Sequence, residues 1–250
     1  MKKEITLQVF VNNNVEEVVT QEIEKISEKY GVTFFKNVEE FYCFRELSEE
    51  VQQEIIDRNR ERNVDYNWWE FTIDYWKEKL EQIGFDNADI RFSGFWSQGD
   101  GASFTAYCDS EKVLNSLLMC EGKLQNYKQW RLWFELIDAG IFKFDISRNS
   151  SHYCHEYTIS GVIHDDFGGL NDRMWYAPDP KKPFNFTSRF EQKANLEYLE
   201  AMFDSFIKDI SRKIYSDLED EYEYLTSDAC LKEYLDNNDE IYNIEGKEAR

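Results

Sequence analysis

The feature that most constrains the fold is a glycine-rich stretch set between aromatic residues, Ser93–Phe104. It reads Ser-Gly-Phe-Trp-Ser-Gln-Gly-Asp-Gly-Ala-Ser-Phe and follows a short apolar run. Asp-Gly between two apolar runs is a strong signal for a β-hairpin. The stretch therefore predicts a turn over Gln98–Gly101 that joins a strand at Ile90–Trp96 to a strand at Ser103–Cys108.

The same stretch also carries groups suited to binding. Glycine permits positive φ and close approach of a ligand to the backbone, and Trp96 offers a stacking surface. The turn and the binding interpretations are compatible, and both stay open. The spacing of the glycines does not match a phosphate-binding fingerprint. The candidate binding residues here are Trp96, Ser97, Gln98, Gly99, Asp100, Gly101 and Ser103.

Charge limits the partners that such a chain can have. Its 250 residues include 50 acidic and 29 basic side chains, which give a net charge of −21. Direct, non-specific binding to nucleic acid depends on basic residues, so this balance argues against it. The balance favours a basic partner, or serves solubility alone. Aromatic residues make up 16% of the chain and prolines number three, which indicates a folded protein.

The cysteines and the apolar runs indicate the cellular compartment in which the protein is expected. The five cysteines are an odd number and lack C-x-x-C spacing. This pattern fits reduced thiols in a cytosolic protein better than a disulfide framework or a structural zinc site. The N-terminus lacks the apolar core of a signal peptide, and no apolar run approaches the ~20 residues that span a bilayer. We therefore expect a cytoplasmic protein without a membrane partner.

The N-terminal region has a strand and helix pattern of its own. Residues 5–11 alternate as a half-buried strand, and Asn14 is placed to cap a helix that stops at Gly31. Short apolar runs at 32–35 and 41–44 predict further strands. Residues 1–46 thus predict a small β-α-β unit, followed by a main domain over 47–250.

The rest of the chain alternates between helical and hairpin patterns. Apolar residues at helical spacing predict helices from Ser48, over 66–83, from Ser110, over 124–139, over 190–221, and from Ser227 or Asp228 to about Leu235. A second hairpin is predicted from strands at 141–147 and 152–163, and 164–188 is the longest candidate loop. The fold class expected is α+β, with antiparallel β-hairpins packed against several amphipathic helices.

The longest helical pattern, 190–221, places seven apolar side chains on one face: Leu196, Leu199, Phe203, Phe206, Ile210, Ile214 and Leu218. Residues 190–250 hold 17 acidic and 7 basic side chains. A solvated face is the simplest interpretation of that charge. The tryptophans of 66–83 also keep helical spacing, which favours core packing over a cofactor box.

A second candidate site is Ser151–Tyr157, which contains two of the three histidines. On a strand, His152, Cys154 and Glu156 share one face, a set of ligand types that zinc accepts. The two histidines then lie on opposite faces, so we favour hydrogen bonding within a sheet and expect no metal. His152, His155 and Glu156 are candidate binding residues, joined by Tyr224 and Asp228 near the end of the long helix.

Catalysis by a nucleophile would need a Ser or Cys, a His base and an orienting acid, for example Cys154 or Ser103 with His152 and Asp100. The sequence does not show that these residues meet, and it contains no G-x-S-x-G elbow. We assign no catalytic residue and no cofactor, and whether the protein is an enzyme stays open, with the balance against it.

Four blocks of the chain resemble a family of uncharacterised bacteriophage proteins, over about residues 46–246. They are Glu46–Glu50, Ile90–Phe104, His152–Tyr157 and Glu221–Asp228. The Phe-Trp-Ser-Gln-Gly-Asp-Gly part of the second block is the most specific. The resemblance implies a setting in the cytoplasm of an infected bacterium and no mechanism. Small acidic phage proteins often act as counter-defence proteins or inhibitors of host proteins, an inference by association.

Two hypotheses follow. In the first, the protein binds a host protein with a basic surface and inhibits a host defence or nucleic-acid-processing function. In the second, it is an enzyme or a binder of a small, nucleotide-like ligand, with a pocket around Trp96–Ser103 and His152–Glu156 and with Tyr222–Asp228 as a third block. The second hypothesis requires the three blocks to meet in one cleft. Self-association into a homo-oligomer is left open.

Overall fold

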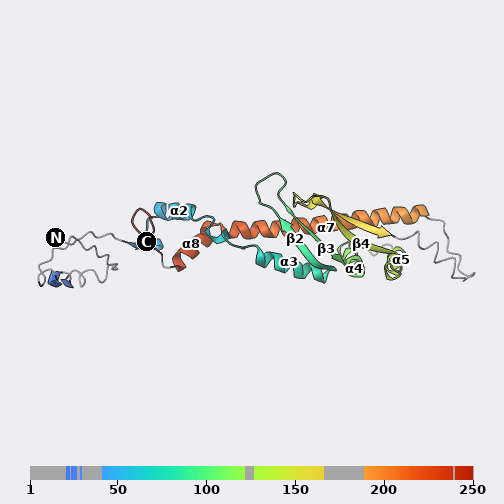
Figure 1. The fold of residues 1–250 in the computed structure, drawn as a ribbon, viewed down its shortest axis with the longest axis horizontal. Coiled ribbons are helices and arrows are strands. Elements are labelled where there is room, and N and C mark those ends of the chain that lie inside the picture. Colours follow the sequence, from blue (N-terminus) through green and yellow to red (C-terminus); the bar gives the residue numbers. More distant parts are fainter. Residues whose placement is uncertain are drawn as a thin grey trace, which may run out of the picture. The chain divides into compact units, whose positions relative to one another are not determined.

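The computed structural model describes residues 41–121, 127–165, 189–238 and 240–249, with a few helical residues between 21 and 29 (Figure 1). The chain folds as two compact units. The first runs as far as Asn63 and resumes at Leu225, and the second is Val64–Tyr224. The β-α-β unit predicted for residues 1–46 lies largely outside the described residues. The boundary predicted after residue 46 therefore stays a prediction.

The first unit is small and built from the two ends of its chain. Its elements are β1 (Tyr42–Cys43), the 3₁₀ helix η1 (Phe44–Glu46), α2 (Glu49–Arg58), α8 (Asp228–Asn237) and β6 (Ile241–Tyr242). Strands β1 and β6 pair antiparallel. Ser48 caps α2 by accepting a backbone N–H bond, as predicted. Of the two candidates Ser227 and Asp228, Ser227 caps α8 in the same way. The buried core is Phe44, Leu47, Ile55, Ile56, Leu231, Leu235 and Tyr242.

The second unit contains two antiparallel hairpins and four helices of the described chain. Its elements are α3 (Glu70–Gln82), β2 (Phe85–Phe92), β3 (Ala102–Cys108), α4 (Ser110–Glu121), α5 (Tyr127–Asp138), β4 (Phe142–Arg148), η3 (Glu156–Thr158), β5 (Ile159–Asp165) and α7 (Arg189–Leu225). Strand β2 pairs with β3, and β4 pairs with β5. The predicted α+β class, with antiparallel hairpins packed against helices, is confirmed.

Helix α7 packs across both hairpins of the second unit. The ring of Phe203 lies 4.7 Å from that of Phe144 on β4 and 6.3 Å from that of Phe85 on β2, measured between centroids. The apolar stripe predicted over 190–221 is therefore a true core face, and the helix continues to Leu225. Its buried apolar side chains are Leu199, Phe203, Ile207, Ile210, Ile214 and Leu218.

Two carboxylates of α7 satisfy backbone groups of β5. Asp204 accepts a hydrogen bond from the N–H of Gly161 at 3.0 Å, and Glu200 accepts one from the N–H of Ile163 at 3.4 Å. One helical turn and two strand residues both span about 6 Å, so residues four apart on the helix match residues two apart on the strand. Part of the acidic charge of α7 is thus used to cap a strand edge.

Some helix ends differ from their predictions. Helix α3 begins at Glu70 instead of near Tyr66, although Gly84 follows its end at φ +99° as expected. Asp109, not Ser110, supplies the cap of α4, because its Oδ1 accepts from the N–H of Lys112 at 3.2 Å. The hydroxyl of Ser110 instead accepts from the N–H of Phe144, which ties α4 to β4.

The contact between α7 and β5 can be tested at Gly161. A Cβ at this position would lie 2.6 Å from Cδ1 of Phe203 and 2.9 Å from the backbone nitrogen of Asp204. We expect Gly161→Ala to lower the free energy of unfolding by about 1–3 kcal/mol, measured by denaturant titration. The matched control is Gly94→Ala, where the added Cβ meets only ordinary contacts at 3.5 Å or more. Equal stability of the two variants would contradict the packing described.

Candidate functional site

The connection between β2 and β3, which we call the 93–101 loop, is longer than the predicted hairpin turn (Figure 1). Strand β2 ends at Phe92, not at Trp96, and the N–H of Ser93 donates to the carbonyl of Gly101. The tight turn is Ser97–Asp100, with Gly99 at φ +97° in the position where a type II turn needs a positive φ. The predicted Asp-Gly turn is therefore displaced by one residue, because Gly101 is engaged with Ser93.

Asp100 faces its own turn. Its N–H donates to the carbonyl of Ser97 at 3.1 Å, and its Oδ2 accepts from the N–H of Ser97 at 2.6 Å. A carboxylate that accepts a backbone N–H in this way stabilises the turn locally. Asp100 is thus explained as a structural residue of the loop.

The predicted strand over 152–163 is wrong in its first half. Strand β5 begins at Ile159, and residues 149–158 form a connection that we call the 149–158 loop. Here Ser150 Oγ accepts from the N–H groups of both His152 and Tyr153 at 3.2 Å. These local bonds compete with strand pairing, so the alternation that placed His152, Cys154 and Glu156 on one face does not apply.

His155 has a positioning role in this loop. Its Nδ1 accepts from the N–H of Tyr157 at 3.2 Å, which caps the short helix η3. Its carbonyl accepts from the hydroxyl of Thr158 at 2.7 Å. Both backbone and side chain of His155 are therefore occupied in fixing the conformation of the loop.

The two loops touch each other at two glycines. A Cβ at Gly101 would lie 2.5 Å from Cβ of His155, and a Cβ at Gly99 would lie 3.2 Å from the ring of Tyr153. Only glycine leaves room for this approach. Beneath the contact, the hydroxyls of Ser103 and Thr158 lie 3.3 Å apart in the core. The predicted sites Trp96–Ser103 and His152–Glu156 are thus brought together. The glycines allow the two loops to pack against each other.

One face of α7 supports both loops. Lys208, Arg212 and Tyr215 follow each other at helical spacing. The hydroxyl of Tyr215 donates to the carbonyl of Gly94 at 3.1 Å, and Nε of Arg212 lies 3.4 Å from Oε1 of Glu156. Burial, together with the Glu219 and Asp100 carboxylates, raises the pKa of Tyr215, so its hydroxyl remains a donor at neutral pH.

Neighbouring aromatic residues of the 93–101 loop point in different directions. The ring of Phe95 packs against Tyr222 at 5.2 Å and Tyr215 at 5.4 Å, and it also approaches Trp68 at 6.1 Å. Trp96, the next residue, is 73% exposed. The aromatic cluster anchors the loop while it leaves the indole of Trp96 in solvent.

Exposed aromatic rings gather on the two loops. Tyr153 is 49% exposed and Tyr157 is 65% exposed on the 149–158 loop, and Trp96 is exposed on the 93–101 loop. The other exposed or half-exposed side chains that we assign to this surface are polar or charged. We call this region the loop surface and define it by Trp96, Ser97, Gln98, His152, Tyr153, Glu156 and Tyr157.

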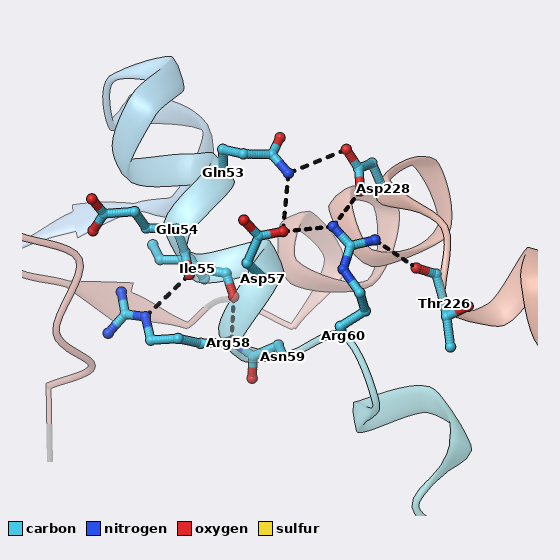
Figure 2. A network of polar contacts seen from close by, with 9 residues as sticks. All are labelled: Gln53, Glu54, Ile55, Asp57, Arg58, Asn59, Arg60, Thr226 and Asp228. Carbon is cyan, nitrogen blue, oxygen red and sulfur yellow. Dashed lines mark hydrogen bonds and ion pairs between the residues drawn. The ribbon is translucent and has the colours of Figure 1, made fainter. Parts of the chain in front are cut away.

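The third predicted block is divided between the two units. Tyr224 is exposed at the end of α7, in the second unit, whereas Asp228 belongs to the first. Figure 2 shows Asp228 in a network with the end of α2: its carboxylate pairs with Arg60 at 2.8 Å and accepts from Gln53 at 3.2 Å. Arg60 also donates to the carbonyl of Thr226. Asp228 therefore ties the start of α8 to α2.

The same network involves a second carboxylate. Hydrogen bonds from Arg60 and Gln53 lower the pKa of Asp57, and Arg60 lies 2.6 Å from it (Figure 2). Arg60 thus bridges two acids and a carbonyl. The residues of this network all belong to the first unit, where the network holds α2 and α8 together.

Lys208, Arg212 and Tyr215 were missed by sequence reasoning. The helical period of α7 indicates which face is buried, but it does not indicate what the polar face contacts. Tyr153 and Tyr157 lie within the predicted site Ser151–Tyr157, but the strand interpretation gave them no role. A helix face that mixes Lys, Arg and Tyr opposite an apolar stripe is the available signal for such a supporting role.

In 41–121, 127–165, 189–238 and 240–249, no three His, Cys, Asp or Glu side chains form a group able to hold a metal ion. Over the same ranges, no helix combines the length and apolar character needed to cross a bilayer.

The thiol of Cys108, at the end of β3, is held in its neutral form. Burial, with the nearby Asp145 and Asp86 carboxylates, raises its pKa from 9.0 to about 12. Because the raised pKa favours the protonated thiol in the folded state, this contribution to stability is present below pH 9 and is lost as the pH rises toward 12. Cys108 is thus a poor nucleophile at neutral pH.

We expect Cys108 to react with iodoacetamide at least about tenfold more slowly than the exposed Cys120 in the folded protein, measured by mass spectrometry of the peptides. The physical reason is the low thiolate fraction together with burial. In denaturant the two rates should converge, which controls for the local sequence. Similar rates in the folded protein would show that Cys108 is accessible and ionised.

Comparison with known proteins adds a family. No curated protein and no solved structure matches the chain. A family model described as a domain of unknown function, DUF8835, matches residues 68–228. The matched region contains both loops and the face of α7 that supports them, and it covers more than half of the sequence. The chain therefore belongs to the DUF8835 family.

Proposed function

We propose that this protein is a binding protein that engages a partner with a basic surface through the loop surface. The observation that supports the proposal is the fixed exposure of three aromatic rings, Trp96, Tyr153 and Tyr157, on two mutually packed loops. Trp and Tyr are enriched among residues that dominate binding energy. Loops that are already ordered lose less conformational entropy on binding, which improves affinity.

The polar groups of the loops fit this role better than a catalytic one. Asp100 accepts from its own turn, and Nδ1 of His155 accepts from the N–H of Tyr157. A general base needs a free acceptor within reach of a substrate proton. Oδ2 of Asp100 and Nδ1 of His155 are instead used to shape the surface.

Charge supports a basic partner. The net charge of −21 attracts cationic surfaces over a Debye length of about 8–10 Å and speeds their association. We extend the proposal to a phage-encoded inhibitor that acts in the cytoplasm of the infected bacterium on a host defence or nucleic-acid-processing protein. The sequence resemblance to bacteriophage proteins and the acidity of the chain support this extension of the proposal.

The test is affinity capture from a bacterial lysate with the tagged full chain and two variants. We expect a basic protein to be captured, and Trp96→Ala to weaken its binding at least about tenfold, because an exposed indole at the centre of an interface is a typical hot spot. The matched control, Tyr107→Ala, removes a ring that is 76% exposed on β3, outside both loops, and should bind normally.

The salt dependence of binding and the nature of the bound species distinguish a protein-binding role from a ligand-binding or enzymatic one. Binding should weaken between about 0.05 and 0.5 M salt, because charge attraction contributes to it. Equal capture by the original chain and Trp96→Ala would exclude the loop surface as the interface. A small molecule retained in native mass spectrometry, without a protein partner, would instead favour the ligand-binding or enzymatic alternative.

A further inference from the structure

We propose that the loop surface selects arginine side chains of its partner, with Glu156 as the pairing carboxylate and the exposed aromatic rings as stacking surfaces. This inference rests on the proposed function and names the chemistry that the partner must present. Two of the protein's own cations, Arg212 and Lys208, already contact Glu156 and Tyr157 of this surface.

Glu156 forms a long ion pair with Arg212. Its side chain is 19% exposed, and its Oε1 lies 3.4 Å from Nε of Arg212. Arg–carboxylate pairs of good geometry lie at 2.7–2.9 Å and are often bidentate. Another nitrogen of Arg212 makes a shorter contact with Asp209, which is the main partner of this guanidinium. Glu156 therefore keeps acceptor capacity for a second guanidinium.

A cation also lies over one of the rings. Nζ of Lys208 is 5.7 Å from the ring centroid of Tyr157, and Asp204 holds the same ammonium at 2.6 Å. Within the described residues, the rings of Trp96 and Tyr153 have no such cation over them. Lys208 thus shows, within the protein itself, a cation shared between a ring and a carboxylate. A partner's cation would make the same kind of contact with the ring of Trp96 and with the exposed part of the Tyr153 ring, whose other contacts are with His152 and His155.

Arginine fits this combination better than lysine. The guanidinium is planar, stacks on aromatic faces, and presents a fork of N–H donors that matches a carboxylate. It is also more weakly hydrated than an ammonium, so less hydration is lost at the surface. Net charge alone attracts Lys and Arg equally. A higher affinity for arginine than for lysine would therefore indicate stacking and carboxylate pairing at the loop surface.

The test uses two fluorescent peptides of equal length and charge, one with four arginines and one with four lysines between glycines. Their affinities for the full chain are measured by anisotropy at about 0.15 M salt. We expect the arginine peptide to bind roughly threefold to fivefold more tightly, the effect of a cation–π contact at an exposed site. This preference should disappear in Trp96→Ala and in Glu156→Gln.

Two matched controls remove the same charge or a similar ring elsewhere. Glu78→Gln neutralises an exposed acid of α3, and Tyr107→Ala removes the exposed ring on β3. Both variants should keep the arginine preference. Arg212→Ala should increase it, because Glu156 loses its competing intramolecular cation. If Glu156 were only structural, Arg212→Ala and Glu156→Gln would lower binding alike.

Equal affinities of the two peptides would overturn the arginine inference and would leave the proposed binding function standing on charge and aromatic contact. Loss of the preference in Glu78→Gln as strongly as in Glu156→Gln would also overturn it, because the effect would then follow from net charge. The proposed function fails separately, when Trp96→Ala captures the protein partner as well as the original chain does.

Discussion

The packing of α7 against both hairpins is the interaction on which the second unit depends. The ring of Phe203 contacts Phe85 and Phe144, so a single helix face joins two hairpins that do not pair with each other. Burial of this apolar stripe provides the dominant favourable free energy. Backbone polar groups near this core also need hydrogen-bond partners. Asp204 and Glu200 meet that need by accepting from the N–H groups of β5. Helix α7 is therefore both a core element and a cap for a strand edge.

The same helix determines where the loops lie. Tyr215 holds the 93–101 loop through the carbonyl of Gly94, and Arg212 contacts the 149–158 loop through Glu156. Gly101 then allows the loops to approach each other against His155. With their polar groups used for these contacts, the loops present aromatic rings to solvent at little further entropic cost on binding. Helix α7 thus connects the fold to the proposed function, because its side chains hold the two loops that would bind the partner.

Periodic features of the chain could be predicted from sequence, and features that depend on distant contacts could not. The stripe of α7 and the caps Ser48 and Ser227 follow from local rules and are present in the structure. The strand predicted from His152 failed because Ser150 bonds the nearby N–H groups, an option that alternation does not reveal. The meeting of Gly101 with His155 joins residues 54 apart, and no local pattern encodes it.

The central claim, that the two loops are ordered before any partner binds, is tested most directly by amide hydrogen exchange of the free protein at single-residue resolution. The N–H groups of Ser97 and Tyr157 are the informative probes, because each donates to a side chain of its own loop. We expect exchange at least about tenfold slower than in an unstructured peptide at both amides. Exchange at the unstructured rate would show that the loop surface is not preorganised, which would contradict the account.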